Sequence, residues 1–217
     1  MSTLITPPFR ISFPSLIKAT GYQGSAEKFS VTALWYTEDV KGKYKVTWGN
    51  LIKRLDETAR EFFQTPLAKL PANIRRGIRN GTEKAHLNGY GSEVLFASLS
   101  ANADRRPQVV DLRKNLLSDD QIRQLCYPGA WARASVNVYA YDNIGKGVAI
   151  GLNNLQWLGH GDRLDSVTDA KQDFEDDPED IWFQQEAESA DPTENAVYGA
   201  TEADKGPPDN YDDDIPF

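Results

Sequence analysis

Hydrophobic and polar residues alternate most clearly over residues 131–142 (WARASVNVYAYD). From 132 to 140 the even positions are all apolar, whereas the odd positions carry polar or aromatic side chains. Successive side chains of a β-strand point to opposite faces. The pattern therefore predicts a strand with one apolar face, and an opposite face that carries Trp131, Arg133, Asn137, Tyr139 and Tyr141. The turn at 142–145 and the run 147–158 predict its hairpin partner.

Shorter patterns predict the remaining elements. Strands are expected at residues 9–13, where Pro14 would end the strand, and at 28–36, 93–99 and 108–112. The spacing of Leu51, Leu55, Ala59 and Phe62 predicts a helix over residues 50–63. Residues 64–92 show no clear period, and we expect a long irregular insertion. Several strands with Gly and Asn turns indicate a mainly β fold, either a small barrel or a sandwich.

Charge divides the chain into two parts. The 217 residues carry a net charge of −8, but residues 1–158 hold 21 Lys and Arg against 13 Asp and Glu, whereas residues 159–217 hold 3 against 19. The first part is therefore +8 and the second −16. We predict a folded basic domain at 1–158 and an acidic tail at 159–217 that stays largely disordered.

Composition excludes several kinds of site. With one cysteine, Cys126, and two histidines, the chain is not expected to contain a disulfide framework, a zinc site or another cofactor. The acids of residues 1–158 are scattered, and there is no phosphate-binding Gly-Lys-Ser loop or nucleophile motif. A nuclease would need a cluster of metal ligands, so we expect a protein that is not an enzyme.

The polar face of the strand at 131–142 carries the two kinds of group that bind single-stranded DNA. Arginine and lysine meet phosphates, and aromatic rings stack on bases. If the strand were instead buried on both faces, the tyrosines would fill a second layer; Arg133 favours an open face. Basic loops usually serve solubility, but the charge of +8 favours a phosphate track. The other candidate DNA-binding residues are Arg105, Arg106, Arg10, Lys28 and Tyr36, and the cluster Arg75, Arg76 and Arg79 is a possible extension.

The C-terminal end combines three acids with an apolar tip. The candidate partner-binding residues are Asp212, Asp213, Asp214, Ile215, Pro216 and Phe217. An apolar pocket with a basic rim would accept such a peptide. A merely solubilising acidic end is the alternative.

Two resemblances extend this interpretation. The end Asp-Asp-Asp-Ile-Pro-Phe resembles that of the bacterial single-stranded DNA-binding protein. Residues 9–158 resemble a family of bacteriophage single-stranded DNA-binding proteins with an OB-fold, through FRISFPSLIKA, EKFSVTALWY, LSANADRRPQVVD and PGAWARASVNVYAYDNIGKGVAIGLNNLQWL. The resemblance implies an OB-fold five-stranded barrel with an added helix, long insertions and the acidic tail. It also implies a role in phage replication and recombination, in the cytoplasm of the bacterial host.

The favoured hypothesis is thus a non-catalytic protein that coats single-stranded DNA and recruits replication proteins through its C-terminal tip. The tail would also compete with DNA for the basic domain. A protein-recruiting module and a general binder of single- and double-stranded DNA are the alternatives. The sequence leaves the oligomeric state open between a monomer and a weak dimer.

Overall fold

The computed structural model describes residues 4–21, 26–143 and 145–165. The strands are β1 (Leu4–Ile5), β2 (Phe9–Thr20), β3 (Lys28–Tyr36), β4 (Ile74–Arg75), β5 (Arg79–Asn80), β6 (Val94–Asn102), β7 (Gln108–Val110), β8 (Trp131–Asp142) and β9 (Lys146–Gly159). The helices are α1 (Thr37–Lys41), α2 (Lys45–Phe63) and α3 (Asp119–Leu125), with the short 3-10 helices η1 (Leu67–Lys69) and η2 (Gly81–Lys84). No helix in these ranges is long and apolar enough to cross a membrane.

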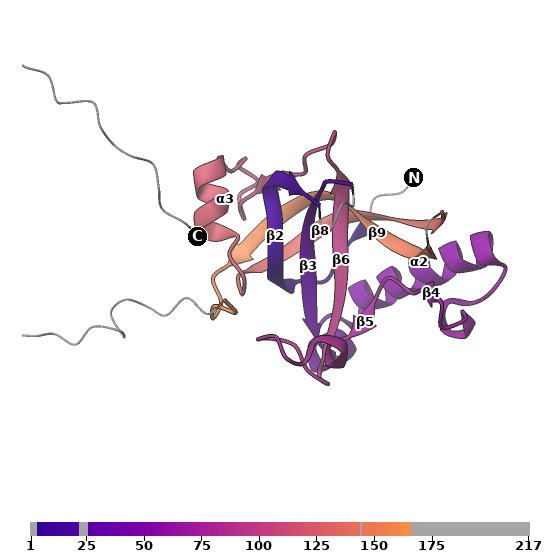
Figure 1. Ribbon diagram of the computed structural model, residues 1–217. Helices are drawn as coiled ribbons and strands as arrows, with labels where there is room; N and C mark the ends of the chain where they lie inside the picture. The colour runs from indigo at the N-terminus through magenta and orange to yellow at the C-terminus, as the bar shows by residue number, and fades with distance from the viewer. Residues whose placement is uncertain (1–3, 22–25, 144, 166–217) are drawn as a thin grey trace, which may run out of the picture. The chain divides into compact units, whose positions relative to one another are not determined.

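Strands β2, β3, β6, β8 and β9 close into a barrel (Figure 1). β2 pairs with β3, β3 with β6 and β8 with β9, all antiparallel, whereas β6 and β9 are parallel. The ring closes where β2 pairs with the start of β8, at Phe9 opposite Ala132. This ring of five strands is the OB-fold barrel that the resemblance implied. The hairpin predicted at 131–158 forms β8 and β9 almost residue for residue.

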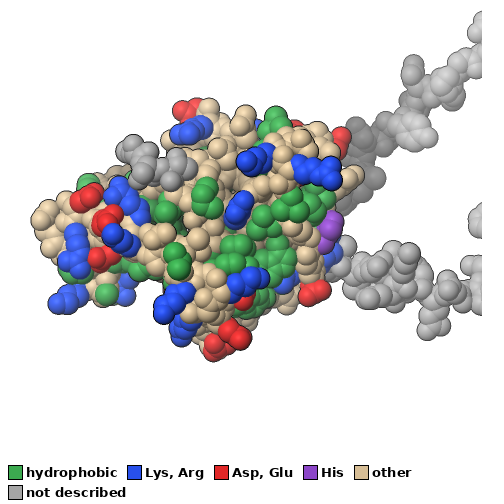
Figure 2. Space-filling view, turned by 180° about the vertical axis from the view of Figure 1, so that it is seen from behind, with side chains coloured by type: hydrophobic (Ala, Val, Ile, Leu, Met, Phe, Trp, Pro, Cys, Tyr) green, Lys and Arg blue, Asp and Glu red, His purple; other side chains and the backbone are tan. Residues whose placement is uncertain are grey.

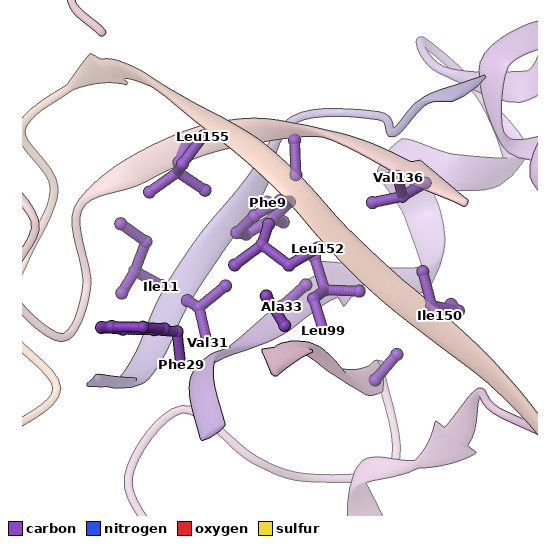
Figure 3. Close-up of a cluster of buried hydrophobic side chains, with 14 of the residues drawn as sticks. Phe9, Ile11, Phe29, Val31, Ala33, Leu99, Val136, Ile150, Leu152 and Leu155 are labelled. Carbon is purple, nitrogen blue, oxygen red and sulfur yellow. The ribbon is translucent and has the colours of Figure 1, made fainter. Parts of the chain in front are cut away.

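The apolar faces of these strands fill the barrel. Phe9 and Ile11 from β2, Val31 from β3, Leu99 from β6 and Ile150 from β9 are each at most 1% exposed (Figure 3). The even residues of β8 from 132 to 138 join them, while its odd residues are more exposed. The predicted assignment of the two faces of β8 is therefore confirmed. Each fully buried aliphatic side chain contributes about 1.5–3 kcal/mol to the free energy of unfolding.

α2 packs on the barrel through one apolar stripe. Leu51, Leu55 and Ala59 are fully buried in the barrel core, as their spacing predicted. The helix starts at Lys45, five residues earlier than expected, so it includes Trp48, whose ring packs edge-on against the Trp35 ring 5.3 Å away. Phe62 was predicted to lie on the buried face but is 51% exposed. It lies at the end of the helix, where it packs edge-on against Phe63 instead.

β2 corrects the prediction that Pro14 ends the first strand. The strand continues to Thr20, with a shift of register between Ser12 and Ser15 where it pairs with β3. Phe13 takes a left-handed backbone conformation at this point, with φ of 45°. A bulge of this kind places proline where the ladder does not need its missing N–H.

Residues 64–92 are mostly irregular, as expected, with only the short elements η1, β4, β5 and η2. β4 adds to β9 and β5 adds to β6, so the insertion lies along the barrel. α3 begins after Ser118, whose hydroxyl caps the helix in a capping box with Gln121. Cys126 at its end is buried, and burial raises the pKa of its thiol to about 12.

The part of the chain after β9 stays packed on the barrel as far as it is described. The backbone N–H of Leu164 donates to the carbonyl of Pro128. The division of the chain at residue 158 stays a prediction, and most of the acidic tail, with its tip at 212–217, lies outside the described residues.

Candidate nucleic-acid interface

A groove of about 550 Å³ lies where β8, β9 and β6 meet the insertion; we call it the tyrosine groove. Its aromatic wall is Tyr139 and Tyr141 of β8, both half-buried. The other lining residues are Lys28, Arg75, Gly77, Arg79, Ser98, Ser100, Asn143, Gly145, Val148, Ala149 and Ile150. The groove thus combines two aromatic rings with three cationic side chains.

Small residues on β9 make room for the two tyrosines. Along residues 147–152 the even positions, Val148, Ile150 and Leu152, are buried in the core, whereas the odd positions are Gly147, Ala149 and Gly151. Ala149 pairs with Tyr139, and Gly147 pairs with Tyr141.

Both glycines have close neighbours. A Cβ atom at Gly147 would lie 2.8 Å from the Tyr141 hydroxyl and 2.8 Å from the Arg75 carbonyl oxygen. A Cβ atom at Gly151 would lie 2.5 Å from Oδ1 of Asn137. Asn137 therefore lies next to the tyrosine groove, on the same outward face of β8. The alternation of large and small residues in GVAIGL is the sequence signal that would have located the floor of the groove.

The cations come from three separate segments. Lys28 is exposed at the start of β3, Arg75 is in β4 and Arg79 is in β5. β4 pairs with β9 at Gly147, and β5 pairs with β6 at Phe96, so two edge pairings bring the insertion to the groove. In an OB-fold, the oligonucleotide lies between the loops that follow the first and fourth strands of the barrel. Here the first of these loops precedes Lys28, and the second contains Asn143 and Gly145.

Aromatic and cationic side chains continue beyond the groove. The Arg79 guanidinium lies 4.4 Å from the centre of the Phe96 ring, and Lys84 Nζ lies 5.4 Å from the same ring. Lys84 Nζ also lies 5.3 Å from the ring of Phe13, which is 55% exposed, and 5.6 Å from that of Tyr90. Burial among these rings, with the charge of Arg79 nearby, lowers the pKa of Lys84. Sequence reasoning missed Phe13 and Lys84 because they meet only after the insertion folds back.

Trp131 and Arg133 share the outward face of β8 with the tyrosines but lie at the other end of the strand. Six residues separate Arg133 from Tyr139, which corresponds to about 20 Å at 3.3 Å per residue. Arg133 Nε donates to Gln156 Oε1 over 2.8 Å.

On the face of the molecule that Figure 2 shows, hydrophobic side chains are exposed between Lys and Arg side chains; the hydrophobic colour includes Tyr.

Three further candidates also lie away from the groove. Arg106 pairs with Asp119 and donates to the Leu16 carbonyl. Arg105 is exposed in the turn before β7. Tyr36 is half-buried at the end of β3, opposite Val94, where it packs on the small cluster around Phe96. Of the predicted set, Lys28, Tyr139 and Tyr141 line the groove, and Asn137 adjoins it.

Arg10 differs most from its predicted role. It is only 7% exposed, and its guanidinium donates to the backbone carbonyls of Gly129 and Asp162. The guanidinium also lies 5.4 Å from the centre of the Trp131 ring. Its donors therefore hold the segments before β8 and after β9 on the barrel, and they are not presented to a ligand.

Replacing Arg10 by methionine is expected to lower the free energy of unfolding by roughly 2 kcal/mol, because two carbonyls lose charged hydrogen-bond donors. Urea denaturation measures this change. The affinity for a dT oligonucleotide should stay the same in the folded variant. A loss of affinity for dT without a loss of stability would show that Arg10 contacts DNA, as the sequence predicted.

Comparisons with known proteins identify the fold and the family. The family model described as the ssDNA-binding protein of Enterobacter phage Enc34 matches residues 2–183. Putative protein p50 of Acyrthosiphon pisum secondary endosymbiont phage 1 is 29% identical over 164 residues, which are 70% of this chain and 81% of that protein.

Two solved structures share the fold. The single-stranded DNA-binding protein from bacteriophage Enc34 in complex with ssDNA has a TM-score of 0.61 and 20% identity, over 74% of this chain and 88% of that chain. The single-stranded DNA-binding protein gp2.5 of bacteriophage T7 has a TM-score of 0.51 and 12% identity, over 82% of this chain and 99% of that one. The family model matches most residues of this chain, so this chain belongs to the family of the single-stranded DNA-binding protein of Enterobacter phage Enc34.

Proposed function

We propose that the chain binds single-stranded DNA in the tyrosine groove, with bases stacked on Tyr139 and Tyr141. The observation that carries the proposal is the meeting of these two rings with Lys28, Arg75 and Arg79 in one groove. The three cations would neutralise phosphates next to the stacked bases. Membership of the Enc34 family supports the same ligand.

The groove favours a single strand over a duplex. Stacking on a side chain needs an exposed base face, which the bases of a duplex present only at its ends. A duplex would instead be held by phosphate contacts alone. We therefore expect binding to single-stranded DNA with little sequence preference.

The direct test is a titration of fluorescently labelled dT oligonucleotide, followed by anisotropy, with an unlabelled duplex as competitor. We expect saturable binding that excess dT reverses and an equal concentration of duplex does not. Equal competition by the duplex would support a general DNA-binding protein instead. Absence of binding would refute the proposal.

We further propose that the protein binds DNA without cleaving it. The ionisable residues that line the tyrosine groove are tyrosine, lysine and arginine. These side chains do not supply the carboxylate or imidazole ligands that a metal-dependent nuclease uses. Within the described ranges, no group of three or more His, Cys, Asp or Glu residues is placed to hold a metal ion. Cleavage of dT in the presence of Mg²⁺ would contradict this assignment.

In the cell, the proposed role is to coat and protect single-stranded DNA during phage replication and recombination, in the cytoplasm of the bacterial host. The C-terminal residues Asp212–Phe217 would recruit replication proteins through their acidic and apolar side chains. The likeness to phage single-stranded DNA-binding proteins supports the replication setting. A pull-down with a peptide of residues 208–217, compared with one in which Ile215 and Phe217 are alanine, tests the recruiting role.

Removing the acidic tail is expected to tighten binding to dT. Residues 159–217 carry −16 and residues 1–158 carry +8, so a tethered tail competes with DNA at high effective concentration. We expect a chain that ends at Asp165 to bind more tightly than the full chain at low salt. The difference should shrink as salt screens the attraction. Equal affinities at low salt would refute competition by the tail.

A further inference from the structure

A second and larger groove lies beside α2, on a part of the barrel separate from the tyrosine groove; we call it the α2 groove. It has a volume of about 980 Å³. Its floor is apolar and includes Val40, Trp48, Ile52, Leu67, Ile78 and Leu95. These residues come from α1, α2, the insertion and β6, so the groove forms where the insertion packs along the helix. The proposed function makes no use of it.

The rim of the α2 groove is basic. Lys41, Lys45, Lys53 and Arg76 line it, and all four are exposed. The acidic residue in the lining is Asp56, whose carboxylate accepts hydrogen bonds from Arg60 Nε over 2.6 Å and from the Leu67 N–H over 2.8 Å. These two donors lower the pKa of Asp56 and offset its charge. Lys53 Nζ also lies 3.9 Å from Glu57 Oε1, at the surface, but the lining still holds four cations against one acid.

An apolar floor with a basic rim selects one kind of ligand. Nucleic acid would find cations at this rim, but the floor is largely aliphatic, and the Trp48 ring is packed against Trp35. A bulky apolar side chain next to carboxylates would satisfy both the floor and the rim, because apolar burial and charge pairing are then met together. We propose that the α2 groove binds an acidic peptide segment of a partner protein, with an aliphatic or aromatic side chain inserted between α2 and residues 67–78.

The insertion connects the two grooves. From residue 75 to 79 the side chains alternate: Arg75, Gly77 and Arg79 line the tyrosine groove, whereas Arg76 and Ile78 line the α2 groove. A peptide that contacts Arg76 and Ile78 therefore presses on the same five residues that hold two of the proposed phosphate-binding cations. This coupling rests on the proposed function, and we expect bound peptide to change the affinity for dT.

The test uses the chain that ends at Asp165, which keeps the five barrel strands and the residues of the barrel core. A fluorescently labelled peptide, PDNYDDDIPF, stands in for the partner's segment because it combines carboxylates with an apolar end; its sequence is that of residues 208–217. We expect saturable binding in an anisotropy titration. A peptide with alanine in place of the isoleucine and phenylalanine should bind at least tenfold more weakly.

Charge reversal locates the site. Lys45→Glu with Lys53→Glu should weaken peptide binding at least tenfold, whereas Lys18→Glu with Lys114→Glu, which makes the same change in net charge away from both grooves, should not. Unchanged binding in the first pair would overturn the proposal. If dT also displaced the peptide completely from the unmodified chain in that case, the peptide would lie in the tyrosine groove.

A dT titration of the same variants separates this proposal from the proposed function. Lys45→Glu with Lys53→Glu should retain the affinity for dT in the absence of peptide. A loss of dT binding in this pair beyond that of the control pair would make the α2 groove a DNA site and overturn the peptide assignment. Peptide binding by a chain that fails to bind dT would refute the proposed function and leave the α2 groove as a peptide site.

Discussion

Replacing Tyr139 and Tyr141 together by alanine is expected to weaken binding to a dT oligonucleotide by about 30-fold to 2 × 10⁴-fold. Each base stacked on an aromatic ring contributes about 1–3 kcal/mol, so loss of two stacking partners removes about 2–6 kcal/mol. The two rings line the tyrosine groove beside Gly147 and Ala149, and no other tyrosine of the described residues lines it. Anisotropy of a labelled oligonucleotide measures the loss.

Two control variants make this result specific. Tyr139→Phe with Tyr141→Phe keeps both rings and should keep most of the affinity. Phe62→Ala removes a more exposed aromatic ring on α2, outside the tyrosine groove, and should leave the affinity unchanged. An equal loss in the phenylalanine and alanine pairs would show that the hydroxyls, and not the rings, hold the ligand.

Replacing Arg75 and Arg79 by glutamine is expected to reduce the salt dependence of binding. Each phosphate neutralised on a single strand contributes about −0.7 to the slope of log K against log salt. Loss of two contacts should therefore make the slope less steep by about 1.4, with the largest loss of affinity at low salt. The ion pair of Arg79 with Glu83, at 3.1 Å on the surface, is weak competition for a phosphate.

Arg105 and Arg133 provide the matched control. Both are exposed arginines that the sequence pattern suggested as DNA-binding, but neither lines the tyrosine groove. Their replacement by glutamine removes the same charge and should change the slope much less. A larger change in this pair than in the Arg75 and Arg79 pair would move the phosphate track to the other end of β8.

The sequence predicts the barrel well because two-residue alternation reports burial directly. In β8 the small and branched side chains at even positions are the ones that enter the core, and the hairpin turn at 142–145 sets its register. Pro14 misled the prediction for β2 because a bulge, which depends on pairing with β3, lets the strand pass through it. Phe62 was wrongly placed on the buried face of α2, because helical spacing does not show where along the helix the contact with the barrel ends.

The site is less predictable, for a related reason. Alternation places Trp131, Arg133, Tyr139 and Tyr141 on one face of β8, but it does not say which end of that face is hollowed. The hollow is lined by Ala149 of β9 and by Arg75 and Arg79 from β4 and β5, which are two residues each. Strands this short leave no periodic signal, so Arg75 and Arg79 stood out only as a basic cluster. The burial of Arg10 by distant segments also leaves no mark in its local sequence.

The measurement that tests the central claim most directly is photocrosslinking of the full chain to a dT oligonucleotide that carries 5-iododeoxyuridine, followed by mass spectrometry of the crosslinked peptides. Stacked aromatic residues form these crosslinks most readily. We expect the crosslinks at Tyr139 and Tyr141, and their loss when excess unlabelled dT is added. Crosslinks at Trp48, in the α2 groove, or at Trp131, at the opposite end of β8, would contradict binding in the tyrosine groove.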